Sequence, residues 1–163
     1  MSRTMVEALR YGFSKNLDYG SRLLSDLAEP QMIEQPAPGM NHPAWILSHL
    51  NIYHPVMLNL LEGKTFPDPK THPFGMDSKP GTNPAEYEPK EVLVRTFVQG
   101  HERALAALQK CDSSALEAEV SLERWKLTMP KVGVCLSYLM LVHENVHLGQ
   151  ISAWRRAMQL PPV

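Results

Sequence analysis

Two histidines near the end of the chain stand four residues apart, at His143 and His147. On an α-helix, residues with this spacing are neighbours on one face, with Cβ atoms about 5 to 6 Å apart. Imidazole nitrogens bind divalent transition metals, and a catalytic zinc site takes three protein ligands and leaves one position open. The pair therefore predicts two of the three ligands of a metal site.

His49 supplies the third imidazole of the predicted site. The histidines lie on two apolar helical rows: Ile46, His49, Tyr53 and Met57, and Leu136, Met140, His143, His147, Ile151 and Trp154. Both rows face the interior of the expected fold, so three imidazoles point at one space. Burying three neutral imidazoles without partners is costly, whereas a divalent ion uses all three nitrogen lone pairs. We therefore predict a metal site formed by His49, His143 and His147.

Residues 143–147 also read His-Glu-Asn-Val-His, the H-E-x-x-H motif in which glutamate is the general base of a zinc protease. No His, Asp or Glu follows His147, so a downstream third ligand is missing. No alternating pattern predicts the sheet that would hold an extended peptide. We therefore reject a protease and expect Glu144 to be solvated or to support a ligand histidine.

The remaining histidines are weaker candidates. His101 lies on the apolar row of the third expected helix and is a possible fourth ligand. His54 follows His49 by five residues, about 140° around the helix, so the two cannot easily share an ion. His42 and His72 each precede a proline at a helix start or in a loop, where solvent exposure is expected.

The elements that must position these side chains are separated by clusters among the 14 prolines. Proline lacks the amide that a helix interior needs, so the stretches between clusters are the expected helices. These cover about 4–27, 43–63, 89–111 and 131–158. Pro55 should kink or break the second of them. No strand pattern appears, so we predict an all-α bundle in which the long Pro-rich loop of residues 62–90 crosses the bundle or covers a site.

Composition limits the other possibilities. A chain of 163 residues with 44% apolar and 20% charged residues fits one globular domain over residues 1–163. The net charge of -1 gives no attraction to nucleic acid, no apolar run is long enough to span a membrane, and the first residues show no leader pattern. Cys111 and Cys135 are expected to be reduced thiols. We predict a cytoplasmic protein with a small-molecule substrate.

Two segments resemble the signatures of the DinB-like superfamily of metalloenzymes. They are Asn41-His-Pro-Ala-Trp-Ile-Leu-Ser-His-Leu50 and Leu141-Val-His-Glu-Asn-Val-His-Leu-Gly-Gln-Ile-Ser-Ala-Trp-Arg-Arg156. The order of helices and the long loop between them also match, so the resemblance covers nearly the whole chain. It implies an up-down-down-up four-helix bundle, often a homodimer, that binds nickel or zinc. By motif position the ligands are again His49, His143 and His147.

The resemblance also implies a class of reaction. Characterised relatives include S-transferases and isomerases that use mycothiol, bacillithiol or glutathione, so the expected activity is transfer of a low-molecular-weight thiol to a small electrophile. The same site could activate water, which would make the protein a hydrolase. A non-catalytic, metal-binding stress-response bundle is the third alternative, and a fourth protein ligand would favour it.

Several residues near the predicted site have open roles. Arg155 and Arg156 would either bind the carboxylates of a thiol at the mouth of the site or form a solvated helix end. Gln150 follows His147 by three residues and is expected to hydrogen-bond a ligand histidine. The three tryptophans are candidates for a substrate pocket or for the core: Trp45, Trp125 and Trp154.

Overall fold

The computed structural model describes residues 3–163, and the regular secondary structure in this range is helical apart from one isolated β-bridge. The longer helices are α1 (Arg3–Ser25), α2 (Pro43–Asn51), α3 (Tyr53–Leu61), α4 (Lys90–Lys110), α7 (Val132–Ser137) and α8 (Glu144–Ala157). The shorter elements are η1 (Glu29–Ile33), η2 (Pro69–Thr71), η3 (Pro84–Glu86), α5 (Ser113–Glu117), α6 (Glu123–Lys126) and η4 (Tyr138–His143). The all-α prediction is confirmed.

Met1 and Ser2, on which the leader expectation partly depended, lie outside the described residues. None of the helices in residues 3–163 combines the length and the apolar character needed to cross a bilayer.

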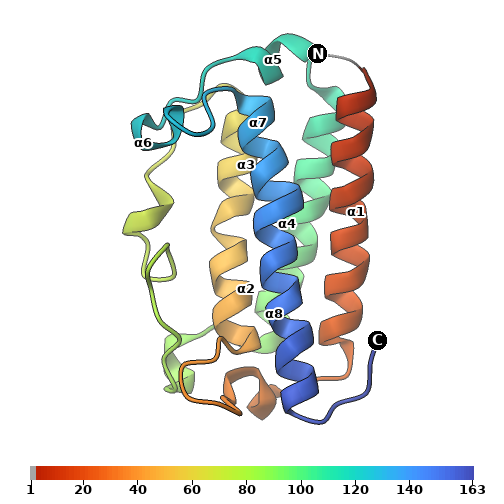
Figure 1. The fold of residues 1–163 in the computed structure, drawn as a ribbon, viewed down its shortest axis with the longest axis vertical. Helices are drawn as coiled ribbons and strands as arrows, with labels where there is room; N and C mark the ends of the chain where they lie inside the picture. Colours follow the sequence, from red (N-terminus) through yellow and green to blue (C-terminus); the bar gives the residue numbers. More distant parts are fainter. Residues whose placement is uncertain (1–2) are drawn as a thin grey trace.

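Four columns of helix lie side by side (Figure 1). One column is α1, one is α2 followed by α3, one is α4, and one is α7 followed by η4 and α8. In Figure 1 the first and last columns run downward and the other two run upward, with residues 62–89 returning along the outside to the start of α4. Contacts join α4 to α1, α2 and α3, and join α8 to α1 and α2.

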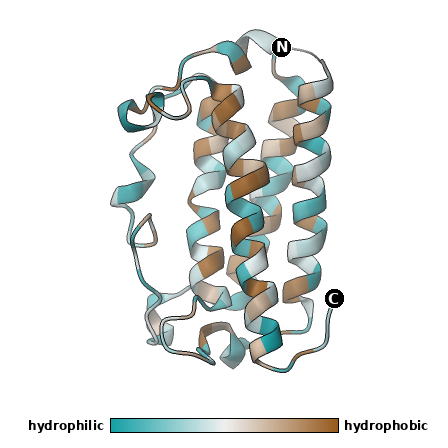
Figure 2. Cartoon of the chain, viewed as in Figure 1, coloured by the Kyte–Doolittle hydropathy of each residue, from teal (hydrophilic) through white to brown (hydrophobic). Residues whose placement is uncertain are grey.

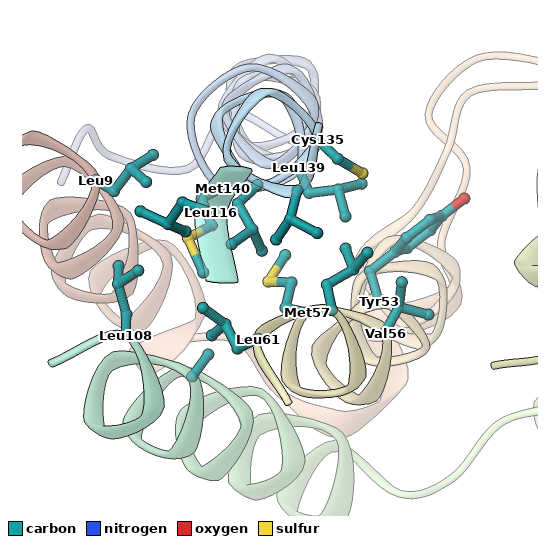
Figure 3. Packing of buried hydrophobic residues seen from close by; sticks show 14 of the residues in the cluster. Leu9, Tyr53, Val56, Met57, Leu61, Leu108, Leu116, Cys135, Leu139 and Met140 are labelled. Carbon is teal, nitrogen blue, oxygen red and sulfur yellow. The ribbon is translucent and has the colours of Figure 1, made fainter. Parts of the chain in front are cut away.

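The helices hold together because their apolar stripes face inward, and hydrophobic and hydrophilic residues are interspersed along each helix (Figure 2). Some apolar side chains of the last column are nevertheless exposed: Val134, Tyr138, Val142 and Val146. The buried apolar side chains form two clusters. The upper cluster includes Phe13, Met57 and Met140, and Figure 3 shows part of it. The lower cluster is centred on Ile46 and Phe97 and continues down α8.

A layer of buried polar side chains separates the two clusters. Each column contributes one: Asn16 from α1, His54 from α3, His101 from α4 and Glu144 from α8. We call these four residues the polar layer. Buried polar groups are costly unless they are paired, so this layer is the part of the core where a function is most expected.

Pro55 breaks the second column into two helices. Proline has no N–H to donate to the carbonyl four residues before it, which here belongs to Asn51. α2 ends at Asn51, and α3 begins at Tyr53, so Ile52 is the junction. Of the two outcomes left open by the sequence, the structure shows the break, although both pieces stay in one column (Figure 1).

The fourth column departs from a regular α-helix at η4, which is a π-helical turn in which each N–H bonds to a carbonyl five residues earlier. Two side-chain amides bond to carbonyls of this turn. Asn16 Nδ2 donates to the carbonyl of Met140 at 2.8 Å, and Asn145 Nδ2 donates to that of Leu141 at 2.7 Å. The expectation of one continuous α-helix from residue 131 to 158 was therefore wrong at this turn.

Gly100 of α4 makes room for the His54 ring. A Cβ at this position would clash with Nδ1 of His54, so we expect Gly100→Ala to lower the unfolding free energy by about 1 to 3 kcal/mol. At Gly149, also helical, a Cβ would meet no atom within 4 Å. Gly149→Ala should stabilise the protein by about 0.5 to 1 kcal/mol. Urea denaturation checks the pair, and equal stabilities of the two variants would contradict the steric explanation.

Candidate metal centre

The structure brings the three predicted histidines together from two columns. His49 lies on α2, His143 ends the π-helical turn and His147 lies one turn later on α8. One ligand atom from each ring lies within 4.8 Å of the others. Nε2 of His49 is 3.0 Å from Nε2 of His143, and the ring of His147 is centred 4.6 Å from that of His49. The three imidazoles therefore surround one small space.

In two of the rings, a hydrogen bond donated by Nδ1 fixes the orientation of the ring and leaves Nε2 without a proton. Nδ1 of His49 donates to the carbonyl of Phe74 at 2.6 Å, and Nδ1 of His147 donates to Oε1 of Gln150 at 2.9 Å. Gln150 is itself oriented by Asn41, whose Nδ2 donates to the same oxygen at 3.1 Å. A ring whose Nδ1 carries the proton has a lone pair on Nε2, which is the usual arrangement around a bound metal. The expected role of Gln150 as a partner of a ligand histidine is confirmed as a contact.

This donor set fits a divalent transition metal. Nε2 of His49 carries a lone pair that faces Nε2 of His143, and Nδ1 of His143 is buried with no hydrogen-bond partner among the described residues. Without a metal, Nε2–H of His143 would donate to Nε2 of His49, which leaves Nδ1 of His143 as an unpaired buried acceptor. A divalent ion would instead accept one lone pair from each of the three imidazoles.

The electrostatics of the site keep the rings neutral. Burial, together with the neighbouring imidazoles, lowers the pKa of His143 to about 3 and that of His147 to about 4. Burial also lowers the pKa of His49, although the bond to the Phe74 carbonyl offsets part of the effect. Because a metal binds the neutral imidazole, these shifts favour binding at neutral pH.

Aromatic packing and a helix cap hold His49 in place. The Trp45 ring stacks on the His49 ring, with centroids 5.0 Å apart. His42 caps α2, since its Nδ1 accepts from the backbone of Trp45 and its Nε2 contacts the carbonyl of Gly81. The expectation that His42 is exposed was wrong, because the ring is fully buried between the start of α2 and the backbone of Gly81. His72 is exposed, as expected.

A pocket of about 630 Å³ opens over the three histidines. Its wall is mainly apolar and aromatic, and it is lined by Trp45, Tyr53, Met76, Trp125, Met129, Tyr138 and Leu139 together with Gly75, Asp77, Arg124 and Thr128. The long loop of residues 62–89 supplies one side of the pocket, so the expectation that it covers a site is confirmed. The volume is within the usual range for a small-molecule site, about 300 to 1,000 Å³.

The basic residue of the pocket is one that the sequence did not single out. Arg124 on the short helix α6 lines the pocket and is held by Asp68, with two hydrogen bonds of 2.6 Å each. A four-residue helix gives no periodic signal, and its approach to Asp68 depends on the path of the loop. No pattern in the sequence therefore pointed to Arg124.

The prediction for Arg155 at the end of α8 was wrong. Arg155 is neither at the pocket nor solvated, because it is buried against the end of α1 and bonded to Asp26. Of the two roles open to Trp154, the structure shows the core: it is fully buried and donates Nε1 to the carbonyl of Glu34 at 2.7 Å. Trp45 and Trp125 do line the pocket.

Glu144 and His101 form a separate buried pair. Glu144 is 1% exposed, which excludes the solvated alternative, and its partner is His101 and not one of the three predicted ligands. Its Oε1 lies 2.9 Å from Nε2 of His101, and neither residue lines the pocket. His101 is accordingly grouped with His54 and Glu144 and not with the three predicted ligands. Burial raises the pKa of Glu144, and the contact with His101 opposes part of that rise.

Comparison with known families agrees with this geometry. A family model described as the DinB superfamily matches residues 13–151, which is most of the chain. The chain therefore belongs to the DinB superfamily. The matched range includes His49, His143 and His147. A comparison with curated proteins gave no match.

Proposed function

We propose that this chain is a divalent-metal-dependent enzyme on an up-down-down-up four-helix bundle, with nickel or zinc held by His49, His143 and His147. The observation that carries the proposal is the convergence of these imidazole nitrogens at the base of a pocket of about 630 Å³. A purely structural zinc site is normally closed by four protein ligands. The group found among the described residues has three, which favours an open, catalytic position.

We propose transfer of a low-molecular-weight thiol to a small electrophile as the reaction. A bound divalent ion lowers the pKa of a coordinated thiol, so that the sulfur reacts as a thiolate at neutral pH. The apolar wall formed by Trp45, Trp125 and Met129 would exclude water and hold an apolar electrophile. Arg124 uses two of its five N–H donors on Asp68, and the others remain for a carboxylate of the thiol.

The position of Glu144 supports thiol transfer over hydrolysis. In the H-E-x-x-H mechanism the glutamate removes a proton from the attacking water. Here Glu144 is buried in the polar layer, contacts His101 and does not line the pocket. A thiol that is already ionised needs no such base. The homodimer implied by the family resemblance stays a prediction, which the mass of the protein in solution would check.

The decisive test is metal content combined with thiol transfer. His49→Ala and His147→Ala are each expected to lose the ion bound by the triad, as measured by plasma mass spectrometry after dialysis. Tyr53→Phe is the matched control, because it keeps a ring against His49 and His143 and removes only a hydroxyl. It should keep the ion.

Activity is measured as consumption of glutathione, mycothiol or bacillithiol in the presence of chlorodinitrobenzene. The metal-loaded wild type should consume thiol, and the alanine variants should fall by about 100-fold or more, since loss of even an indirect partner costs about 10- to 100-fold. A metal content unchanged in both alanine variants would overturn the metal site. If the protein binds metal but turns over none of the three thiols, the proposed thiol transfer is overturned and the proposed metal site is retained.

A further inference from the structure

A second group of metal-binding side chains lies in the polar layer, away from the pocket. His54 of α3, His101 of α4 and Glu144 of α8 each offer one ligand atom, and these atoms lie within 4.8 Å of one another. All three side chains are at most 3% exposed. None of them lines the pocket described above. The group is therefore separate from the histidine triad, although Glu144 directly follows His143 in the chain.

The contact between His101 and Glu144 requires a positive species between the two groups. Nδ1 of His101 donates to the carbonyl of Phe97 at 2.9 Å, and Nε2 of the same ring lies 2.9 Å from Oε1 of Glu144. Either a proton or a metal ion can fill this position, because each links a ring nitrogen to a carboxylate oxygen.

His54 and the second oxygen of Glu144 add unpaired atoms to the same space. Both ring nitrogens of His54 and Oε2 of Glu144 are buried without a hydrogen-bond partner among the described residues. Nε2 of His54 lies 3.9 Å from Oε2 of Glu144. A buried polar atom without a partner costs about 1 to 3 kcal/mol. The surroundings nevertheless hold these groups in place, because Gly100 clears room for His54 and Phe13 stacks on His101 at 4.1 Å.

We propose that His54, His101 and Glu144 bind a second divalent transition-metal ion. Two imidazole nitrogens and one carboxylate oxygen form a ligand set suited to zinc and other first-row metals. One ion would be bound by one ring nitrogen of His101, one ring nitrogen of His54 and a carboxylate oxygen of Glu144. A proton shared by His101 and Glu144 would satisfy that contact alone and would leave His54 and Oε2 of Glu144 without partners, whereas one ion would bind all three residues.

The role of this ion would be structural, because its ligands are buried and Oε2 of Glu144, which has no hydrogen-bond partner among the described residues, would close the fourth position that a catalytic site leaves open. Its three ligands come from three columns, so the ion links α3, α4 and α8 across the polar layer. Its ligands are shielded from the pocket, and a substrate there would not reach it. Metal binding to such a group contributes directly to folding stability, because the unfolded chain offers no preformed site.

Zinc stoichiometry tests the proposal. After dialysis against Zn²⁺ and removal of free metal, the wild type is expected to hold about two ions per chain, and His54→Ala and His49→Ala about one each. Glu144→Gln keeps the shape of the side chain and removes its charge, and it should also fall to about one ion. Phe13→Leu is the matched control, since it alters the packing on His101 without removing a ligand, and it should keep both ions.

The outcomes separate this proposal from the triad. One ion in the wild type that is lost in His49→Ala and kept in His54→Ala overturns the second site and leaves the first. Two ions that persist in both His54→Ala and Glu144→Gln overturn the assignment of these ligands. Because a buried substitution can unfold the chain, Tm is also measured in the double variant His49→Ala/His147→Ala, which retains the polar layer. Addition of Zn²⁺ should raise its Tm, and an unchanged Tm overturns the proposal.

Discussion

Metal-free protein is expected to lose about 3 to 6 kcal/mol of its unfolding free energy between about pH 7 and about pH 5. The cause is a set of buried histidines that stay neutral in the folded state. Burial lowers the pKa of His54 to about 3, of His143 to about 3 and of His147 to about 4. A small domain has a total stability of about 5 to 15 kcal/mol, so this loss is a large fraction of the total.

The sign follows from proton binding in the two states. Below the unfolded pKa of 6.5 the unfolded histidines bind protons and the folded ones do not, so acid favours unfolding. Each of the three histidines loses about 2 kcal/mol over this interval. Glu144 acts in the opposite direction, because its raised pKa lets the folded state bind a proton that the unfolded state does not. The range of 3 to 6 kcal/mol allows for that opposition.

Urea denaturation of the apo protein at a series of pH values measures the effect. His147→Gln removes one of the three groups, so the unfolding free energy of this variant should fall less steeply than that of the wild type, with the slope reduced by about 1 kcal/mol per pH unit. An unfolding free energy that stays constant from about pH 7 to about pH 5 would show that these rings are not held neutral. Saturating Zn²⁺ should shift the pH-dependent fall in unfolding free energy to lower pH, because protons and metal compete for the same nitrogens.

Arg155→Ala is expected to cost about 2 to 4 kcal/mol of stability. The guanidinium is buried and bonds to both oxygens of Asp26, at 2.5 and 2.9 Å, and to the carbonyls of Leu23 and Pro161, at 2.9 Å each. It therefore ties α8 to the end of α1 and to the last residues of the chain. Removal leaves both carbonyls without this donor. The cost stays below that of a fully buried ion pair, because the Asp26 side chain is 43% exposed and keeps contact with water.

The adjacent Arg156 provides the control for this prediction. Arg156 is exposed, so Arg156→Ala should change the unfolding free energy by no more than about 0.5 kcal/mol. Arg155→Lys should recover only part of the loss, since an ammonium cannot reproduce the planar, two-pronged contact with Asp26. Guanidinium denaturation of the three variants checks the series, and equal stabilities of Arg155→Ala and Arg156→Ala would contradict the role given to the buried pair.

Helical spacing was enough to predict the histidine triad. His49, His143 and His147 stand on apolar rows, and residues on such rows meet when helices pack. The long loop was also foreseeable as a covering segment, because its prolines exclude a helix. These predictions depended only on patterns within single segments of the chain.

The missed features depend on contacts between distant segments. Asn16, which bonds to the π-helical turn, is 124 residues from Met140, and no local pattern connects the two. The same holds for the second group, in which His54 and His101 meet Glu144 only after three columns pack. Arg155 looked like a solvated helix end because the sequence does not show that Asp26 lies beside it.

The π-helical turn at Tyr138–His143 also sets the angular register of the fourth column. It adds one residue without adding a turn, and one residue corresponds to about 100° around an α-helix axis. Deleting a single residue there would restore an ordinary helix and rotate α7 against α8 by about that angle. Either Leu136 would leave the upper cluster or Ile151 would leave the lower one. The π-helical turn thus changes the angular position of the residues that follow it, so that the apolar stripe of α7 faces the upper cluster and that of α8 faces the lower cluster.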